Sequence, residues 1–64
     1  MTKLLTQSEA ADVLQLTPRQ VLRLANRGEL PSVVFPNKEI RFDAVDLARF
    51  VKSHKRPLPQ GVPQ

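Results

Sequence analysis

The sequence contains no cysteine, so neither a disulfide framework nor a cysteine zinc site can stabilise the fold. It has no apolar stretch close to the roughly 20 residues of a membrane span, and its first residues lack the apolar core of a signal peptide. A chain of 64 residues builds one small domain, which buries only about 60% of the surface that the unfolded chain exposes. We therefore expect a cytoplasmic protein whose small core is supported by helix capping.

Side chains that could carry catalysis are equally scarce. The chain has three serines, one histidine and no glycine-rich phosphate loop, and several of its carboxylates stand at predicted helix starts. The histidine, His54, lies before a proline-rich segment and has no other metal ligands beside it in the sequence. We expect no enzymatic activity, no metal ion and no cofactor, and we expect His54 to be exposed to solvent.

The net charge of +4 is confined to two segments of the chain. Residues 1–16 and 42–51 each carry a charge of −1, whereas residues 17–41 and 52–64 each carry +3. Segregated basic charge of this kind favours a polyanionic partner such as double-stranded DNA. In the second basic segment, Lys52, Lys55 and Arg56 either form a solvated helix end, which we favour, or contact phosphates or a neighbouring copy.

A helix-start signature occurs three times, with an oxygen-bearing N-cap residue and a polar residue three positions later. The three pairs are Thr6 with Glu9, Thr17 with Gln20, and Asp43 with Asp46. Pro18 stands at the first helical position of the second helix, and Gly28 suits the left-handed conformation that ends a helix. The sequence predicts helices over about 7–14, 18–27 and 44–52.

Only Gln15 and Leu16 separate the first predicted helix from the cap of the second, which is the spacing of a helix-turn-helix. Apolar residues recur at helical spacing in all three helices and predict their buried faces. These residues are Ala10, Ala11, Val13 and Leu14 in the first helix, Val21, Leu24 and Ala25 in the second, and Leu47, Ala48, Phe50 and Val51 in the third.

The opposite face of the second helix carries donors that suit phosphates and the major-groove edges of guanine and adenine. With its cap residue, this candidate recognition helix offers Thr17, Arg19, Gln20, Arg23, Asn26 and Arg27. Arg19 and Arg23 are the candidates for reading bases. Leu22 lies between this face and the core, where it either touches a thymine methyl group or packs beside the core, and we favour packing.

Residues 32–35 and 39–42 are rich in β-forming side chains and flank Pro36-Asn37-Lys38, which predicts a short hairpin. The predicted fold is therefore mainly α with a small β-hairpin: a winged helix-turn-helix of three helices, with the wing between the second and third. We place this domain at residues 1–55. The prolines and low apolar content of residues 56–64 predict a disordered tail.

From Leu4 to Val51, about three quarters of the chain, the sequence resembles the MerR-like excisionase family of winged helix-turn-helix proteins. The resemblance rests on the order and spacing of several short motifs. These are Leu4-Leu5-Thr6, Ala10-Ala11, Gln15-Leu16-Thr17, Val21-Leu22-Arg23-Leu24, Gly28-Glu29-Leu30-Pro31, Ile40-Arg41-Phe42, and Asp46-Leu47 with Phe50.

The resemblance implies that the second helix enters the major groove and that the wing lies along the adjacent minor groove or backbone. It assigns DNA contacts to Arg19, Gln20, Arg23, Arg27, Asn37, Lys38 and Arg41, although Asn37 and Lys38 could equally serve turn geometry and solubility. It also implies a recombination directionality factor that binds and bends attachment-site DNA cooperatively, with neighbouring copies and an integrase as partners. A small phage or mobile-element transcriptional regulator and a protein-interaction module are the alternatives.

Two features depart from the family pattern. Gln15 stands where relatives commonly have glycine, so a left-handed turn there would cost on the order of 1 kcal/mol, and the turn could take another shape. The chain also ends soon after the third predicted helix, where full MerR regulators continue into a dimerisation helix and an effector-binding region. We therefore expect no small-molecule effector.

Overall fold

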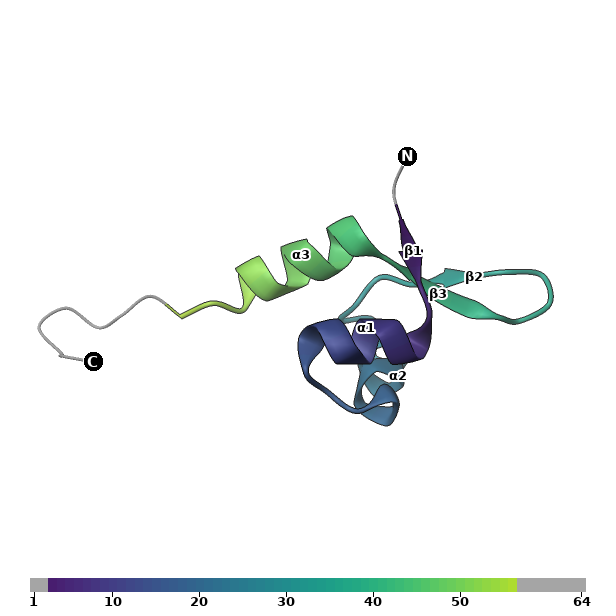
Figure 1. Cartoon of the computed structure of the whole chain (residues 1–64), viewed down its shortest axis with the longest axis horizontal. Coiled ribbons are helices and arrows are strands. Elements are labelled where there is room, and N and C mark those ends of the chain that lie inside the picture. Colours follow the sequence, from purple (N-terminus) through teal and green to yellow (C-terminus); the bar gives the residue numbers. More distant parts are fainter. Residues whose placement is uncertain (1–2, 57–64) are drawn as a thin grey trace, which may run out of the picture.

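The computed structural model describes residues 3–56, which form three helices and a three-stranded antiparallel sheet (Figure 1). In chain order the elements are β1 (Leu4–Leu5), α1 (Gln7–Leu14), α2 (Pro18–Asn26), β2 (Val33–Val34), β3 (Ile40–Asp43) and α3 (Ala44–Ser53). This arrangement confirms the predicted winged helix-turn-helix. Apart from Arg56, the tail predicted for residues 56–64 lies outside the described residues.

The first two helices begin at reciprocal capping boxes, as predicted. The Thr6 hydroxyl accepts the Glu9 backbone N–H at 3.1 Å, and the Glu9 carboxylate accepts the Thr6 N–H at 2.9 Å. At the start of α2, the Thr17 hydroxyl accepts the Gln20 N–H at 3.1 Å, and the Gln20 side-chain oxygen accepts the Thr17 N–H at 2.9 Å. Each box satisfies two backbone donors that have no partner within the helix.

The third helix begins with only half of this arrangement. The Asp43 carboxylate accepts the Val45 N–H at 2.8 Å, so Asp43 is the N-cap, as predicted. Asp46 lies in the first turn, where its charge suits the helix dipole. Within residues 3–56, however, the reciprocal bond occurs in α1 and α2 alone. Aspartate is one methylene shorter than the glutamate or glutamine that closes the other two boxes.

Both helices of the helix-turn-helix end in the same left-handed motif. At the end of α1, Gln15 has a φ of 57°, its N–H donates to the Asp12 carbonyl, and the Leu16 N–H donates to the Ala11 carbonyl. At the end of α2, Gly28 has a φ of 75° and the same pair of bonds runs back to the last turn. This is the Schellman arrangement. The turn therefore keeps the left-handed shape without a glycine at its first position.

The sheet has the order β1-β3-β2. β1 pairs with β3 through Leu4 opposite Asp43 and Leu5 opposite Phe42, a pairing that the sequence did not predict. A strand of two residues has too short a pattern to be recognised, and its partner lies almost forty residues away. β2 pairs with β3 in the predicted hairpin, although Val33–Val34 is shorter than the expected run over 32–35, and β3 is shifted one residue from 39–42.

The hairpin turns through Pro36, Asn37 and Lys38, as predicted. The Phe35 N–H donates to the Glu39 carbonyl at 2.9 Å, and the Lys38 N–H donates to the Phe35 carbonyl at 2.8 Å. Lys38 has a φ of 67°, and the Asn37 side chain accepts the Glu39 N–H at 3.1 Å. A three-residue loop that ends in a left-handed residue is a common hairpin connection.

A core of seven apolar side chains lies between the helices and the sheet. The buried residues are Leu5, Ala10, Ala11, Val21, Leu30, Phe42 and Leu47. Leu14, Leu24, Ala25 and Phe50, which the periodicity also placed inward, are partly buried against this core. Leu30 was not among the predicted core residues, although it is almost completely buried.

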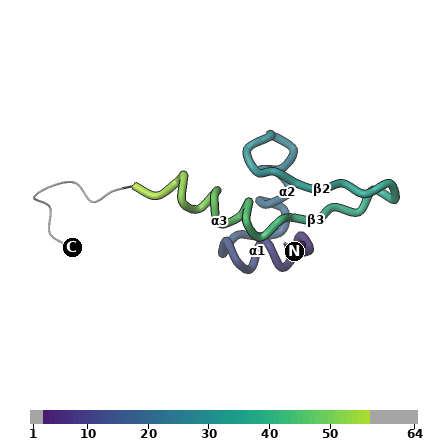
Figure 2. The backbone as a smooth tube through the Cα atoms, turned by 90° about the horizontal axis from the view of Figure 1, so that it is seen from above, coloured from purple at the N-terminus to yellow at the C-terminus, as the bar shows by residue number. Residues whose placement is uncertain are grey.

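Three predictions of buried residues were wrong: Val13, Ala48 and Val51 are exposed. Val13 lies at the edge of the α1 stripe and is 59% exposed. Ala48 and Val51 belong to α3, which extends away from α1 and α2 in the direction opposite to the wing (Figure 1, Figure 2). Phe50 still packs against the core, but the side of α3 that carries Ala48 and Val51 is left exposed.

Candidate nucleic-acid interface

The pairing of α1 with α2 fixes the orientation of the candidate recognition helix. Ala10 and Ala11 of α1 and Val21 of α2 are all buried in the core. Small side chains at such a contact allow two helix backbones to approach closely. The Gln7 side-chain amide also donates to the Pro18 carbonyl at 2.8 Å and joins the start of α1 to the first turn of α2. Sequence reasoning missed Gln7, because its partner is a backbone atom eleven residues away.

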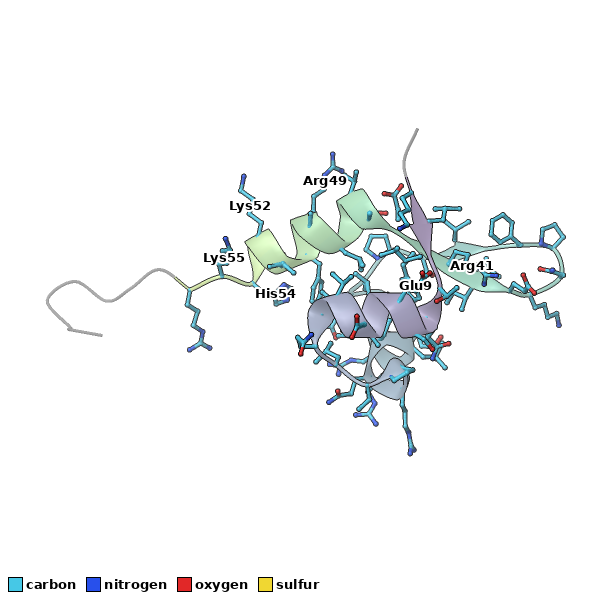
Figure 3. All side chains as sticks on the ribbon, in the orientation of Figure 1. Glu9, Arg41, Arg49, Lys52, His54 and Lys55 are labelled. Carbon is cyan, nitrogen blue, oxygen red and sulfur yellow. The ribbon has the colours of Figure 1, made fainter. Side chains whose placement is uncertain are left out.

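Burial of Val21 turns a strongly basic face of α2 to solvent. Arg19, Arg23, Asn26 and Arg27 are exposed, and together with Leu22 they line a shallow, open depression of about 330 Å³. Side chains with nitrogen ends extend from α2 on the side away from α3 (Figure 3). The structure thus brings together four of the six residues predicted for the recognition helix.

The other two predicted residues, Thr17 and Gln20, build the start of α2. Gln20 uses its side-chain oxygen to accept the Thr17 N–H, and Thr17 uses its hydroxyl oxygen to accept the Gln20 N–H. The donor groups of these side chains, the Gln20 NH₂ and the Thr17 O–H, are not used in the box. Both side chains therefore combine a structural role with donors that suit a phosphate.

Two of the predicted DNA-contacting arginines are paired with carboxylates. The Arg27 Nε lies 2.8 Å from Glu29, and the Arg41 guanidinium lies 3.2 Å from Glu39. Arg41 also donates to the Ile40 carbonyl at 2.8 Å, so its side chain lies along β3. The Arg27–Glu29 pair is exposed, and such pairs contribute only about 0–1 kcal/mol, so Arg27 can exchange its carboxylate for a phosphate. Arg41 is half-buried.

The remaining predicted cations form no ion pair within residues 3–56. These are Arg19 and Arg23 on α2 and Lys38 at the wing tip, all three exposed. Asn37, beside Lys38, uses its side-chain oxygen to hold the turn, so the turn-geometry interpretation is correct for this oxygen. The Asn37 NH₂ group takes no part in that bond.

Leu22 lies at the border between the core-facing side of α2 and its basic face. It is 36% exposed, whereas Leu24 and Ala25 are the residues of α2 that are partly buried against the core. It instead shares the surface depression with Arg19, Arg23, Asn26 and Arg27. The helical periodicity predicted only that Leu22 lies between the core-facing side and the basic face of α2. In the structure its exposed part lines the basic depression.

The basic residues of α3 belong to a different surface. Arg49 and Lys52 point away from α1, on the opposite side of the molecule from α2 (Figure 3). His54 is exposed, as predicted, and ends α3 with its Nδ1 2.8 Å from the Phe50 carbonyl oxygen and its ring against the Phe50 ring. Arg49 and Lys52 therefore form no part of the basic face of α2.

Residues 3–56 contain no group of three or more histidine, cysteine or acidic side chains that could hold a metal ion. In the same part of the chain, no helix is long and apolar enough to cross a membrane.

A family model described as a helix-turn-helix domain matches residues 4–55, which include the first strand, the helix pair, the wing and α3. A search of curated proteins finds no match.

Proposed function

The chain belongs to the helix-turn-helix domain family, and from this premise we propose that it binds double-stranded DNA sequence-specifically, with α2 in the major groove. The observation that carries the proposal is the exposed face of α2 that carries three arginines. Arg19, Arg23 and Arg27 follow one another at intervals of four residues, and no acidic residue occurs in the helix. Residues at this spacing share one helix face.

The dimensions of α2 suit the groove. An α-helix with its side chains is about 10–12 Å across, which fits the major groove of B-DNA at about 12 Å wide. Arg19 and Arg23, which have no carboxylate partner within residues 3–56, are the candidates for guanine O6 and N7. Arg27, Asn26, Thr17 and Gln20 would then contact the remaining base edges and the phosphates.

The wing supplies a second point of contact. Lys38 stands exposed at its tip beside Asn37, and Arg41 lies on the central strand that connects the wing to the core. We place these three residues against the minor groove or the backbone next to the α2 site. Backbone contacts fix the register of the protein on the duplex without reading the sequence, and minor-groove contacts distinguish A·T from G·C pairs.

For the biological role we propose an excisionase-like recombination directionality factor that binds and bends attachment-site DNA cooperatively and favours excision by an integrase. The family resemblance of residues 4–51 supports this role, and its partners would be DNA, neighbouring copies of the chain and the integrase. A small transcriptional regulator of a phage or mobile element uses the same DNA contacts. The two roles differ in the DNA that is bound.

Gel-shift titrations of wild type, Arg23→Ala and Arg49→Ala test the binding proposal. We expect Arg23→Ala to weaken binding to duplexes selected from a random pool by roughly 5- to 150-fold, the effect of one lost arginine–base contact. Arg49→Ala removes the same charge from the opposite side of the domain and should bind as wild type does. Binding that both variants weaken equally would mean that net charge alone drives it, and no binding to any duplex would favour the protein-interaction alternative.

The same assay on attachment-site and promoter DNA from the neighbourhood of the gene separates the two biological roles. Stepwise ladders on attachment-site fragments, together with bending in a circular-permutation assay, would support the excisionase. One discrete complex on the promoter, with attachment-site DNA left unbound, would support the regulator.

A further inference from the structure

Leu22 is an apolar side chain at the centre of a basic surface. It is the middle residue of α2, which runs from Pro18 to Asn26. The depression that contains it is otherwise lined by three arginines and an asparagine. Leu22 is 36% exposed and lies outside the buried core, so its exposed part places apolar surface among basic side chains.

The neighbours of Leu22 define what it can meet. Arg19 lies three residues before it and Asn26 four residues after it, so both flank it on the same helix face. Arginine and asparagine are the side chains that form paired hydrogen bonds with guanine and adenine in the major groove. The major-groove edge of DNA presents one apolar group, the C5-methyl of thymine, and apolar side chains contact it.

We propose that Leu22 is a specificity-determining residue that reads a thymine by packing against its C5-methyl group, between base contacts made by the flanking polar side chains. This inference rests on the proposed insertion of α2 into the major groove. The central position in the helix supports it, because the middle of a helix that lies in the groove is held close to the base edges. The contact adds a preference for thymine to the guanine preference of the arginines.

Deoxyuridine tests the contact directly, because it differs from thymidine only by the missing C5-methyl. Each thymine of a duplex selected by the wild-type protein is replaced in turn, and binding is measured for wild type, Leu22→Ala and Val45→Ala. Val45 is an exposed apolar residue of α3 and serves as the matched control. Both substitutions remove exposed apolar groups from a helix, and circular dichroism verifies that the variants are folded.

We expect replacement of one thymine to weaken wild-type binding about fourfold, the effect of one methyl group left unburied. Leu22→Ala should bind the two duplexes equally, whereas Val45→Ala should keep the fourfold difference. If wild type binds every replaced duplex as tightly as the parent, or if the difference persists in Leu22→Ala, the inference is wrong while DNA binding stands. If no duplex is bound, the proposed function fails, and the inference fails with it.

Discussion

Gln15 and Gly28 end α1 and α2 with the same backbone geometry, although only one of them is glycine. A side chain in the left-handed conformation costs about 1–2 kcal/mol, because its Cβ crowds the following carbonyl oxygen. Glycine avoids this cost, but it gives the unfolded chain more freedom and thereby loses about 0.4–1 kcal/mol relative to alanine. At position 15 the first effect exceeds the second, so glycine should be the more stable residue there.

The comparison that isolates this effect is Gln15→Gly against Gln15→Ala. Both variants lose the bond from the Gln15 side chain to the Asp12 carbonyl, which has a length of 2.8 Å, so the difference between them reports the backbone alone. We expect the glycine variant to be more stable by about 0.5–1 kcal/mol, or about 2–8 °C in Tm for a domain of this size. Thermal unfolding followed by circular dichroism at 222 nm measures it.

Asp12 provides the control, because it is an exposed residue within α1. There the order should be reversed, with Asp12→Gly less stable than Asp12→Ala by about 0.5–1 kcal/mol, as is usual inside a helix. If alanine equals or exceeds glycine at position 15 as well, Gln15 is not strained and the account of this turn is refuted.

Three further predictions concern the fold. Phe42→Ala empties the centre of the core, where Phe42 is fully buried, and should cost about 3–5 kcal/mol in urea unfolding. Thr17→Ala removes the cap that Gln20 completes, and should lower the free energy of unfolding by about 1 kcal/mol without changing the denaturant slope. The pKa of Glu9 lies below its ordinary value of 4.5, because the carboxylate accepts the Thr6 N–H. Ionised Glu9 therefore stabilises the fold above pH 4.5, and this contribution is lost as the pH falls through the lowered pKa. Glu9→Gln keeps an acceptor for the same bond and should flatten that part of the stability profile.

The helix boundaries were predictable because their determinants are local. Thr6, Thr17 and Asp43 each act on backbone donors within three residues, and the left-handed residue Gly28 ends α2 through bonds within its own last turn. The hairpin turn at Lys38 is similarly local. Because each of these signals lies within a few neighbouring residues, the helix-turn-helix and the wing could be predicted without knowledge of long-range contacts.

The features that could not be predicted are those that depend on which helices and strands pack against one another. Periodicity assigned Val51 to a buried face, but α3 extends beyond the rest of the domain and leaves it exposed. Leu5 pairs with Phe42 across a strand too short to recognise, and Leu30 is buried although it lies in a connection. The sequence placed Leu22 between the core-facing side and the basic face of α2, and only the packing of α2 shows that Leu22 lines the basic depression.

The most direct test of the central claim, that α2 binds DNA, compares two double variants with the same net charge. Arg19→Ala/Arg23→Ala removes two cations from α2, and Arg49→Ala/Lys52→Ala removes two from the opposite side of the domain. Their affinities for a selected duplex are measured over a range of salt concentrations.

For wild type we expect the binding constant to fall with salt at a log–log slope of about −3 to −4, as for roughly four neutralised phosphates. The α2 double variant should lose more than tenfold in affinity, whereas the α3 double variant should stay within about threefold of wild type. Equal losses in the two variants would mean that net charge alone drives binding. A wild-type affinity that does not respond to salt would contradict the claim outright.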